Sequence, residues 1–119
     1  MIATPSVVQQ VLEAFACGEN PPRESVKAAV KATMAAFIDV APGRSVEIRI
    51  PPYSAIQAVP GATHRRGTPP AVVETDARTW LELCTGRIGW EQARNRVHAS
   101  GERSDLSGWL PLYAPEQVT

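Results

Sequence analysis

The chain has 119 residues, a mass of 12.8 kDa and equal numbers of basic and acidic side chains, 12 of each. This length is typical of one domain, and a composition of 44% hydrophobic and 20% charged residues is typical of folded rather than disordered proteins. The charges are also balanced between the two halves of the chain, so neither half has the basic stripe of a nucleic-acid-binding protein. We therefore expect a single domain over residues 1–119 with no nucleic-acid partner.

The N-terminal residues carry no signal for secretion or membrane insertion. They contain no basic cluster and lead into no continuous apolar stretch, so we expect a cytoplasmic protein without stable membrane insertion. The two cysteines, Cys17 and Cys84, form no Cys-x-x-Cys pair and have no histidine pair nearby. We interpret both as reduced thiols of the core.

Two amphipathic helices are predicted within residues 1–43. Thr4-Pro5 is a helix-start signal, and apolar residues then recur at helical spacing as far as Gly18. Asn20-Pro21-Pro22 repeats the signal, and a longer apolar face follows until Pro42-Gly43. Because each helix has one apolar face, each needs an apolar surface to pack against.

The spacing of hydrophobic residues changes in residues 44–115, which are predicted to form a sheet with covering helices. Apolar and polar residues alternate over residues 45–50, which is typical of a half-buried strand. Residues 53–59 predict a second strand, with apolar side chains on both faces, and residues 71–74 predict a third. The Pro- and Gly-rich residues 60–70 between them predict a surface loop.

Two helices and a strand are expected next. Asp76 is placed to cap a helix that ends before Gly86, a residue suited to the left-handed conformation beyond a helix C-terminus. Residues 88–93 predict a further short helix, and residues 97–100 predict the last strand.

The last predicted element is a helix that begins at Ser104 or Asp105 and stops before Pro111. The order of elements is then ααβββααβα. This order indicates an α+β fold, with a small, mostly antiparallel or mixed sheet of about four to five strands covered by short amphipathic helices.

The sequence lacks the motifs of several common chemistries. It has no glycine-rich phosphate-binding loop and no Gly-x-Ser-x-Gly turn, and His64 and His98 have no partner at metal-ligand spacing. We therefore expect no cofactor, no metal site and no enzymatic activity. A carboxylate pair for acid–base chemistry stays open from sequence alone, among Asp39, Glu47, Glu74 and Asp76.

Two groups of residues have both a structural and a functional interpretation. The triplet His64-Arg65-Arg66 is the one local concentration of basic side chains, and in its loop it either lies in solvent or contacts an anionic headgroup. Trp80, Trp90 and Trp109 lie on predicted short helices, where core packing is the first interpretation and ligand contact the second.

Residues 75–88 resemble the sterol carrier protein family, in which a strand leads into a short helix that ends in a Thr-Gly-Arg pattern, here Thr85-Gly86-Arg87. Residues 96–106 are similar to the family's terminal strand, turn and closing helix. Residues 42–50 and 66–70 are similar to its compact bacterial members. The resemblance implies a sheet with helices on one face, and between them an apolar tunnel that accepts sterols, fatty acids or acyl thioesters without transforming them.

This resemblance carries the functional prediction, which is non-catalytic binding or carriage of an apolar ligand in a pocket between sheet and helices. The alternative is a fold filled by its own side chains, which acts as an interaction or accessory module. The sequence leaves the oligomeric state open between monomer and homodimer. At matching positions the resemblance implies that six residues face the tunnel, namely Trp80, Leu81, Cys84, Leu106, Trp109 and Leu110. Phe37, Ile48 and Ile50, on predicted apolar faces, are further candidates for the same pocket.

Overall fold

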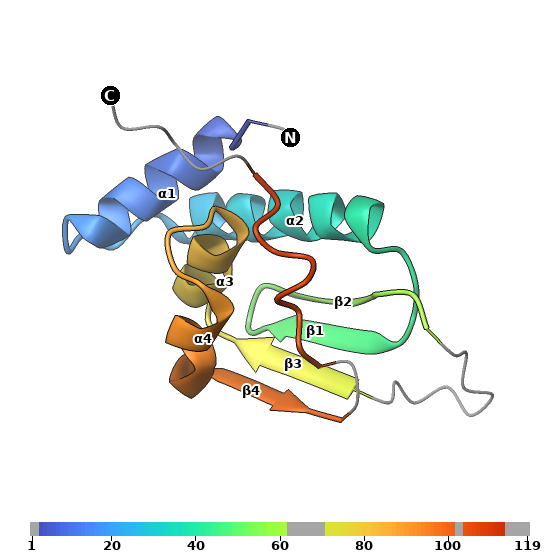
Figure 1. Cartoon of the computed structure of the whole chain (residues 1–119). Helices are drawn as coiled ribbons and strands as arrows, with labels where there is room; N and C mark the ends of the chain where they lie inside the picture. The colour runs from blue at the N-terminus through green and yellow to red at the C-terminus, as the bar shows by residue number, and fades with distance from the viewer. Residues whose placement is uncertain (1–2, 62–70, 102–103, 114–119) are drawn as a thin grey trace.

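The computed structural model describes residues 3–61, 71–101 and 104–113. The described elements are, in chain order, α1 (Ser6–Ala16), α2 (Arg23–Val40), β1 (Val46–Ile50), β2 (Ser54–Ala58), β3 (Ala71–Thr75), α3 (Ala77–Cys84), α4 (Trp90–Ala93), the 3-10 helix η1 (Arg94–Arg96) and β4 (Val97–Ser100). The strands form one sheet in the order β2-β1-β3-β4. Strands β1 and β3 pair in parallel, and the two outer pairs are antiparallel (Figure 1). The predicted α+β fold with a small mixed sheet is confirmed.

The sheet has one buried face and one more exposed face. Val46, Ile48 and Ile50 of β1 are fully buried, whereas Glu47 and Arg49 between them are not, because side chains alternate across a strand. The register places Val73 of β3 beside Ile48, so the apolar residues of neighbouring strands share the buried face. This face is the floor of the hydrophobic core.

Helices α2 and α3 lie over the buried face, and α1 packs against both of them (Figure 1). The longest, α2, lies across the sheet and contacts β2, α1 and α3. Its buried residues recur at the three- and four-residue spacing of one helix face: Val26, Ala29, Val30, Thr33, Met34 and Phe37. The core therefore forms where this stripe meets the apolar face of the sheet.

Helix ends match the predicted signals in part. Asp76 caps α3, because its carboxylate accepts a hydrogen bond from the Thr79 backbone N–H at 3.0 Å, and Gly86 beyond the helix has φ +75°. At the starts of α1 and α2, however, the caps are Pro5 and Pro22, and no side chain makes a capping hydrogen bond. Each proline stands at the N-cap, one residue before the first residue of its helix, and its carbonyl accepts the first N–H groups of the helix, from Val8 and Gln9 in α1 and from Ser25 and Val26 in α2.

The connection from α2 into β1 is tied to the end of β2. Val59 has a left-handed backbone with φ +73°, which a β-branched residue rarely adopts. Its N–H donates to the Ala41 carbonyl at 2.6 Å, and its carbonyl accepts from the Ser45 hydroxyl at 2.7 Å. At Gly43, with φ +151°, any side chain would overlap the Val59 carbonyl. The conformation at Val59 is thus held by contacts from the α2–β1 connection.

The predicted final helix is wrong. Residues 104–113 form a turn at residues 107–109 and otherwise an irregular segment, which runs from the β4 side of the sheet to the helices (Figure 1). Between Asp105 and Pro111 the chain includes Gly108 and is too short for a stable isolated helix. Its apolar residues instead pack one at a time, with Leu106 and Tyr113 buried.

The cysteines differ from each other, which corrects one prediction. Both are free thiols, but only Cys84 is buried, as predicted. Cys17 is exposed because it follows the last turn of α1, in the bend formed with Gly18. In the part of the chain that the structure describes, no helix combines the length and apolar character that crossing a membrane requires.

Candidate functional site

Seven of the nine residues predicted to contact an apolar ligand lie in the packed core. Each is at most 1% exposed: Phe37, Ile48, Ile50, Trp80, Leu81, Cys84 and Leu106. The other two, Trp109 and Leu110, are partly buried and pack against the core from the C-terminal segment. The predicted headgroup contacts, His64, Arg65 and Arg66, lie outside the described residues.

Trp80 fills the centre of the layer between sheet and helices. Its indole N–H donates to the Thr33 hydroxyl of α2 at 2.9 Å. Its ring packs against Phe37, with 5.6 Å between ring centroids and 58° between ring planes. A buried indole that has a hydrogen-bond partner and a tilted aromatic neighbour in contact is well packed, so the centre of this layer is occupied by side chains.

Cys84 belongs to this closed region and anchors the C-terminal segment. Burial raises the pKa of its thiol well above the ordinary value, so the thiol stays protonated and is a poor nucleophile. The backbone carbonyl of Cys84 accepts hydrogen bonds from the N–H groups of Leu112 and Tyr113, at 2.9 and 3.3 Å. The segment 104–113 is thereby fixed against α3.

Open space lies at the other end of the helical layer, beside α4. One cavity of about 230 Å³, the polar cavity, is lined by Trp90, Arg94, Val97, Ala99, Ser104 and Asp105. A second of about 200 Å³, the apolar cavity, is lined by Leu83, Gly86, Ile88, Gly89, Trp90, Ser107, Leu110 and Pro111. Trp90 lines both, and residues 104–111 supply a wall to each. Of the nine candidate residues, Leu110 alone lines either of these two cavities.

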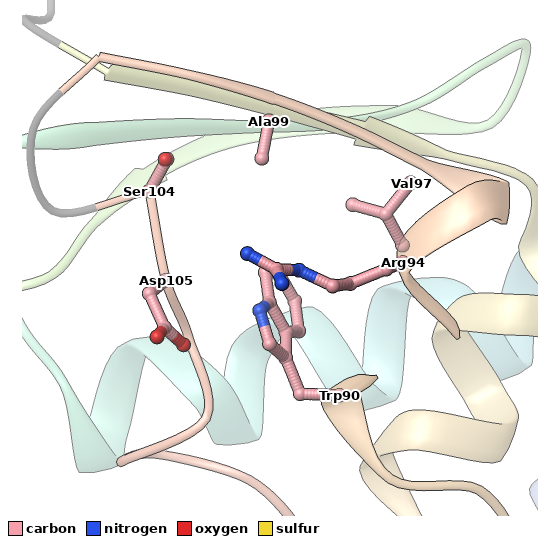
Figure 2. Close-up of a pocket in the computed structure, with 6 residues that line it drawn as sticks. All are labelled: Trp90, Arg94, Val97, Ala99, Ser104 and Asp105. Atoms are coloured by element: carbon pink, nitrogen blue, oxygen red, sulfur yellow. The ribbon is translucent and has the colours of Figure 1, made fainter. Parts of the chain in front are cut away.

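The polar cavity exists because β4 lacks the cover that β1 and β3 have. The register places Ala99 beside Val73 and Val97 beside Thr75, so Val97 and Ala99 belong to the inner face of the sheet. Val73 is buried, but Ala99 is exposed, because only the four-residue helix α4, η1 and the C-terminal segment stand opposite β4. Figure 2 shows Val97 and Ala99 facing Trp90 and Arg94, with Ser104 and Asp105 on the opposite wall.

Two opposite charges face the polar cavity. The Arg94 guanidinium forms a surface ion pair with Glu91 at 3.3 Å, and both side chains are more than two-thirds exposed. Asp105 accepts a hydrogen bond from the Ser107 backbone N–H at 2.9 Å. Hydrogen bonds from the side chain and backbone of Ser107 lower the pKa of Asp105, and the positive charge of Arg94 lowers it further. Asp105 is therefore ionised at neutral pH.

A third depression of about 320 Å³ lies at the turn between β1 and β2, away from the helices. Its lining is Arg49, Pro51, Pro52, Tyr53, Ser54 and Ala55. Among the described residues, one charged side chain lines it and no other part of the chain faces it, so that part of the structure shows no convergent polar groups of the kind typical of a ligand site.

The family model described as bacterial SCP ortholog, SCP denoting sterol carrier protein, matches residues 22–112. The chain belongs to this family. A search of curated proteins found no match. The match begins at the start of α2 and ends at Leu112, so it includes the sheet, the packed core under α2, and both cavities beside α4. Membership of the sterol carrier protein family indicates lipid binding or carriage in general terms.

Sequence reasoning missed most of the residues that line the two cavities of this family member. Core packing is the first interpretation of Trp90, Asp105 is predicted only as a possible helix start, and Arg94 is assigned no role from the sequence. The sequence did contain a signal, because Arg94 directly follows the predicted helix 88–93 and stands four residues, about one helical turn, after Trp90. Nothing in the sequence placed Asp105 opposite them, since that depends on the path of the irregular C-terminal segment.

Among residues 3–61, 71–101 and 104–113, no group of three or more histidine, cysteine and acidic side chains could hold a metal ion. Of the four carboxylates left open as an acid–base pair, Asp76 caps α3 and Asp39 is exposed at the C-terminal end of α2. Glu47 and Glu74 lie on the outer face of the neighbouring strands β1 and β3, where the register places Arg49, the ion-pair partner of Glu47, beside Glu74.

Proposed function

We propose that this protein binds and carries a lipid with a single hydrocarbon chain, without transforming it, in the two cavities on either side of Trp90. The observation that carries the proposal is that one side chain, Trp90, forms a wall of both a mainly apolar and a polar cavity. Family membership supports the lipid class, because the sterol carrier protein family indicates lipid binding in general terms.

The two linings suit the two ends of an amphiphile. In the apolar cavity, Leu83, Ile88 and Leu110 offer hydrocarbon surface to an acyl chain. In the polar cavity, Arg94 and Asp105 offer charged groups to a head. Ligand pockets are mostly apolar with a few polar groups and occupy about 300 to 1,000 Å³. Each cavity alone is below that range, so the proposed ligand uses both.

The proposed site is at the edge of the helical layer rather than at its centre. Trp80 and Phe37 occupy the centre, and a ligand there would have to displace buried aromatic rings. The size of the edge cavities favours a flexible chain over a rigid four-ring sterol. We therefore propose fatty-acyl lipids as the ligand class, with no catalytic group required.

The test is binding of a series of fatty acids of increasing chain length, measured by calorimetry below their aggregation concentrations. Each methylene buried in the apolar cavity is worth about 0.8 kcal/mol, so affinity should rise about fourfold per methylene until the cavity is full. Native mass spectrometry of the purified protein, before and after denaturation, should release a mass in the fatty-acid range.

Two tryptophan substitutions locate the site. Ile88→Trp places a large ring in the apolar cavity and should weaken binding at least tenfold. Ile38→Trp makes the same change at a half-buried position on α2 that lines neither cavity, and it should leave binding unchanged. Equal effects of the two variants, with both proteins folded by circular dichroism, would overturn the proposed location.

A second function, an interaction or accessory module without a lipid ligand, is favoured by the closed core around Trp80. The same experiments separate the two. A native mass equal to the bare chain or a multiple of it, together with no binding of any chain length, would support the module and would report its oligomeric state.

A further inference from the structure

The polar cavity holds one positive and one negative group on different walls. Arg94 comes from η1, and Asp105 comes from the irregular segment that follows β4 (Figure 2). Within the described part of the chain, Arg94 pairs with Glu91, and no ion pair joins Arg94 to Asp105. The two charges therefore face a shared space without neutralising each other by direct contact.

The positions of both charged groups are set by local structure. Asp105 is held by the Ser107 N–H at 2.9 Å, and hydrogen bonds from Ser107 keep its pKa below the ordinary value. Arg94 follows α4 directly and stands one helical turn after Trp90, so its side chain emerges on the same side as the indole ring (Figure 2). A guanidinium, a carboxylate and an aromatic ring thus line one cavity of about 230 Å³.

We propose that the polar cavity recognises a zwitterionic lipid head, with a phosphate bound by Arg94 and a quaternary ammonium bound by Asp105 and the Trp90 ring. This inference rests on the proposed function, because the hydrocarbon chain of the same ligand would lie in the apolar cavity. A guanidinium forms charge-assisted hydrogen bonds with phosphate oxygens. Carboxylates and indole faces both attract quaternary ammonium groups.

The charges disfavour the two simpler kinds of head. A head with only negative charge would gain Arg94 but would be repelled by Asp105, with Glu91 beside Arg94 adding further negative charge. A neutral head would displace water from both charges and pair with neither, which costs free energy. A head that carries both a negative and a positive charge can pair with Arg94 and with Asp105 at the same time.

The test compares three lipids with the same ten-carbon chain, kept below their aggregation concentrations. They are a lysophosphatidylcholine with a zwitterionic head, a lysophosphatidate with an anionic head and a monoacylglycerol with a neutral head. Calorimetric titration of the unmodified protein should give the zwitterionic lipid an affinity about five- to tenfold above each of the others.

Three variants assign the effect to the two charges. Arg94→Gln should weaken lysophosphatidylcholine about fivefold and leave monoacylglycerol unchanged. Asp105→Asn keeps an oxygen for the Ser107 N–H but removes the negative charge, so it should weaken lysophosphatidylcholine and strengthen lysophosphatidate. Arg44→Gln, at an exposed arginine outside the cavities, is the matched control and should change none of the three affinities.

The outcomes separate this inference from the proposed function. Equal affinities for the three lipids would overturn the zwitterion inference while the lipid-carrier function stands, since the shared chain would still bind. Opposite effects of Asp105→Asn, with lysophosphatidate weakened, would also overturn it. Failure of all three lipids to bind would overturn both proposals together.

Discussion

Trp80 and Trp90 lie in two regions of the same helical layer, one closed and one open. Trp80 lies under α2, is 1% exposed and donates its N–H to Thr33. Trp90 lies under no long helix, is partly buried and lines two cavities. The difference comes from the cover, because an 18-residue helix crosses the sheet at one end and a four-residue helix stands at the other. An identical residue is a core residue in one place and the wall of a candidate site in the other.

The largest expected loss of stability follows from a substitution in the closed region. Trp80→Ala should lower the free energy of unfolding by about 3 to 5 kcal/mol, because it opens a cavity in the centre of the core. Trp90→Ala should lower it by about 1 kcal/mol, since that ring is only partly buried. Urea denaturation followed by circular dichroism measures both, and equal losses would contradict the distinction between the two regions.

The next prediction tests whether all parts of the C-terminal segment, residues 104–113, are equally weakly packed. Leu106 is fully buried, so Leu106→Ala should cost about 3 kcal/mol of unfolding free energy. Leu110→Ala, in the same segment but on the wall of the apolar cavity, should cost about 1 kcal/mol. Urea midpoints of the two variants check this, and a smaller loss for Leu106→Ala would show that the segment does not anchor where we place it.

A smaller effect concerns the polar contact at the closed centre. Thr33→Val keeps the side-chain shape but leaves the Trp80 N–H buried without its acceptor, which should cost about 1 to 3 kcal/mol. Thr33→Ser retains the hydroxyl and is the control, with a smaller expected loss. Thermal unfolding monitored by tryptophan fluorescence distinguishes them. Equal destabilisation of the two variants would contradict this weight for the hydrogen bond, because only Thr33→Val removes the hydroxyl that accepts it.

The smallest effect is at the open edge and depends on pH. The pKa of Asp105 is lower in the folded protein, so its ionised carboxylate stabilises the fold above the unfolded pKa of about 3.9. That contribution is lost as the pH falls through the folded-state pKa. Asp105→Asn should therefore be slightly less stable than the unmodified protein at neutral pH and equally stable in acid. Urea midpoints across this range would contradict the assignment if the difference persisted in acid.

The sequence predicted regular elements well and irregular ones poorly, for physical reasons. The spacing of hydrophobic residues, together with proline, glycine and capping residues, predicted both long helices, the four described strands and the Asp76 cap. These signals are local in sequence. The final helix was wrong because apolar residues at helical spacing, such as Leu106 and Leu110, also suit a segment that packs each side chain separately. The prediction that Cys17 is buried was wrong, because cysteine as a residue type suggests burial while the position after α1 exposes it.

The candidate site was harder to predict than the fold. The family resemblance was confirmed, yet the residues assigned to a tunnel by that resemblance include Trp80 and Leu81, which are packed against their neighbours here. Whether an apolar residue faces a ligand or another side chain depends on the volume available around it, and that volume is fixed by distant elements. The length of α4 and the path of residues 104–111 decide it, and neither has a local sequence signal.

The junction at Val59 has a consequence for how the molecule opens in solution. Because the Val59 N–H is bonded to Ala41 and its carbonyl to Ser45, the end of β2 is joined to the connection that leaves α2. A fluctuation that frees this amide must release helix, connection and hairpin together, so its hydrogen should exchange with solvent only through large openings. The β4 edge has no such junction among the described residues, and its outward-facing amides should exchange through small, local ones. Local opening would then be confined to the β4 end, where the ligand is proposed to bind, and the end of the sheet at Val59 would open only with larger unfolding.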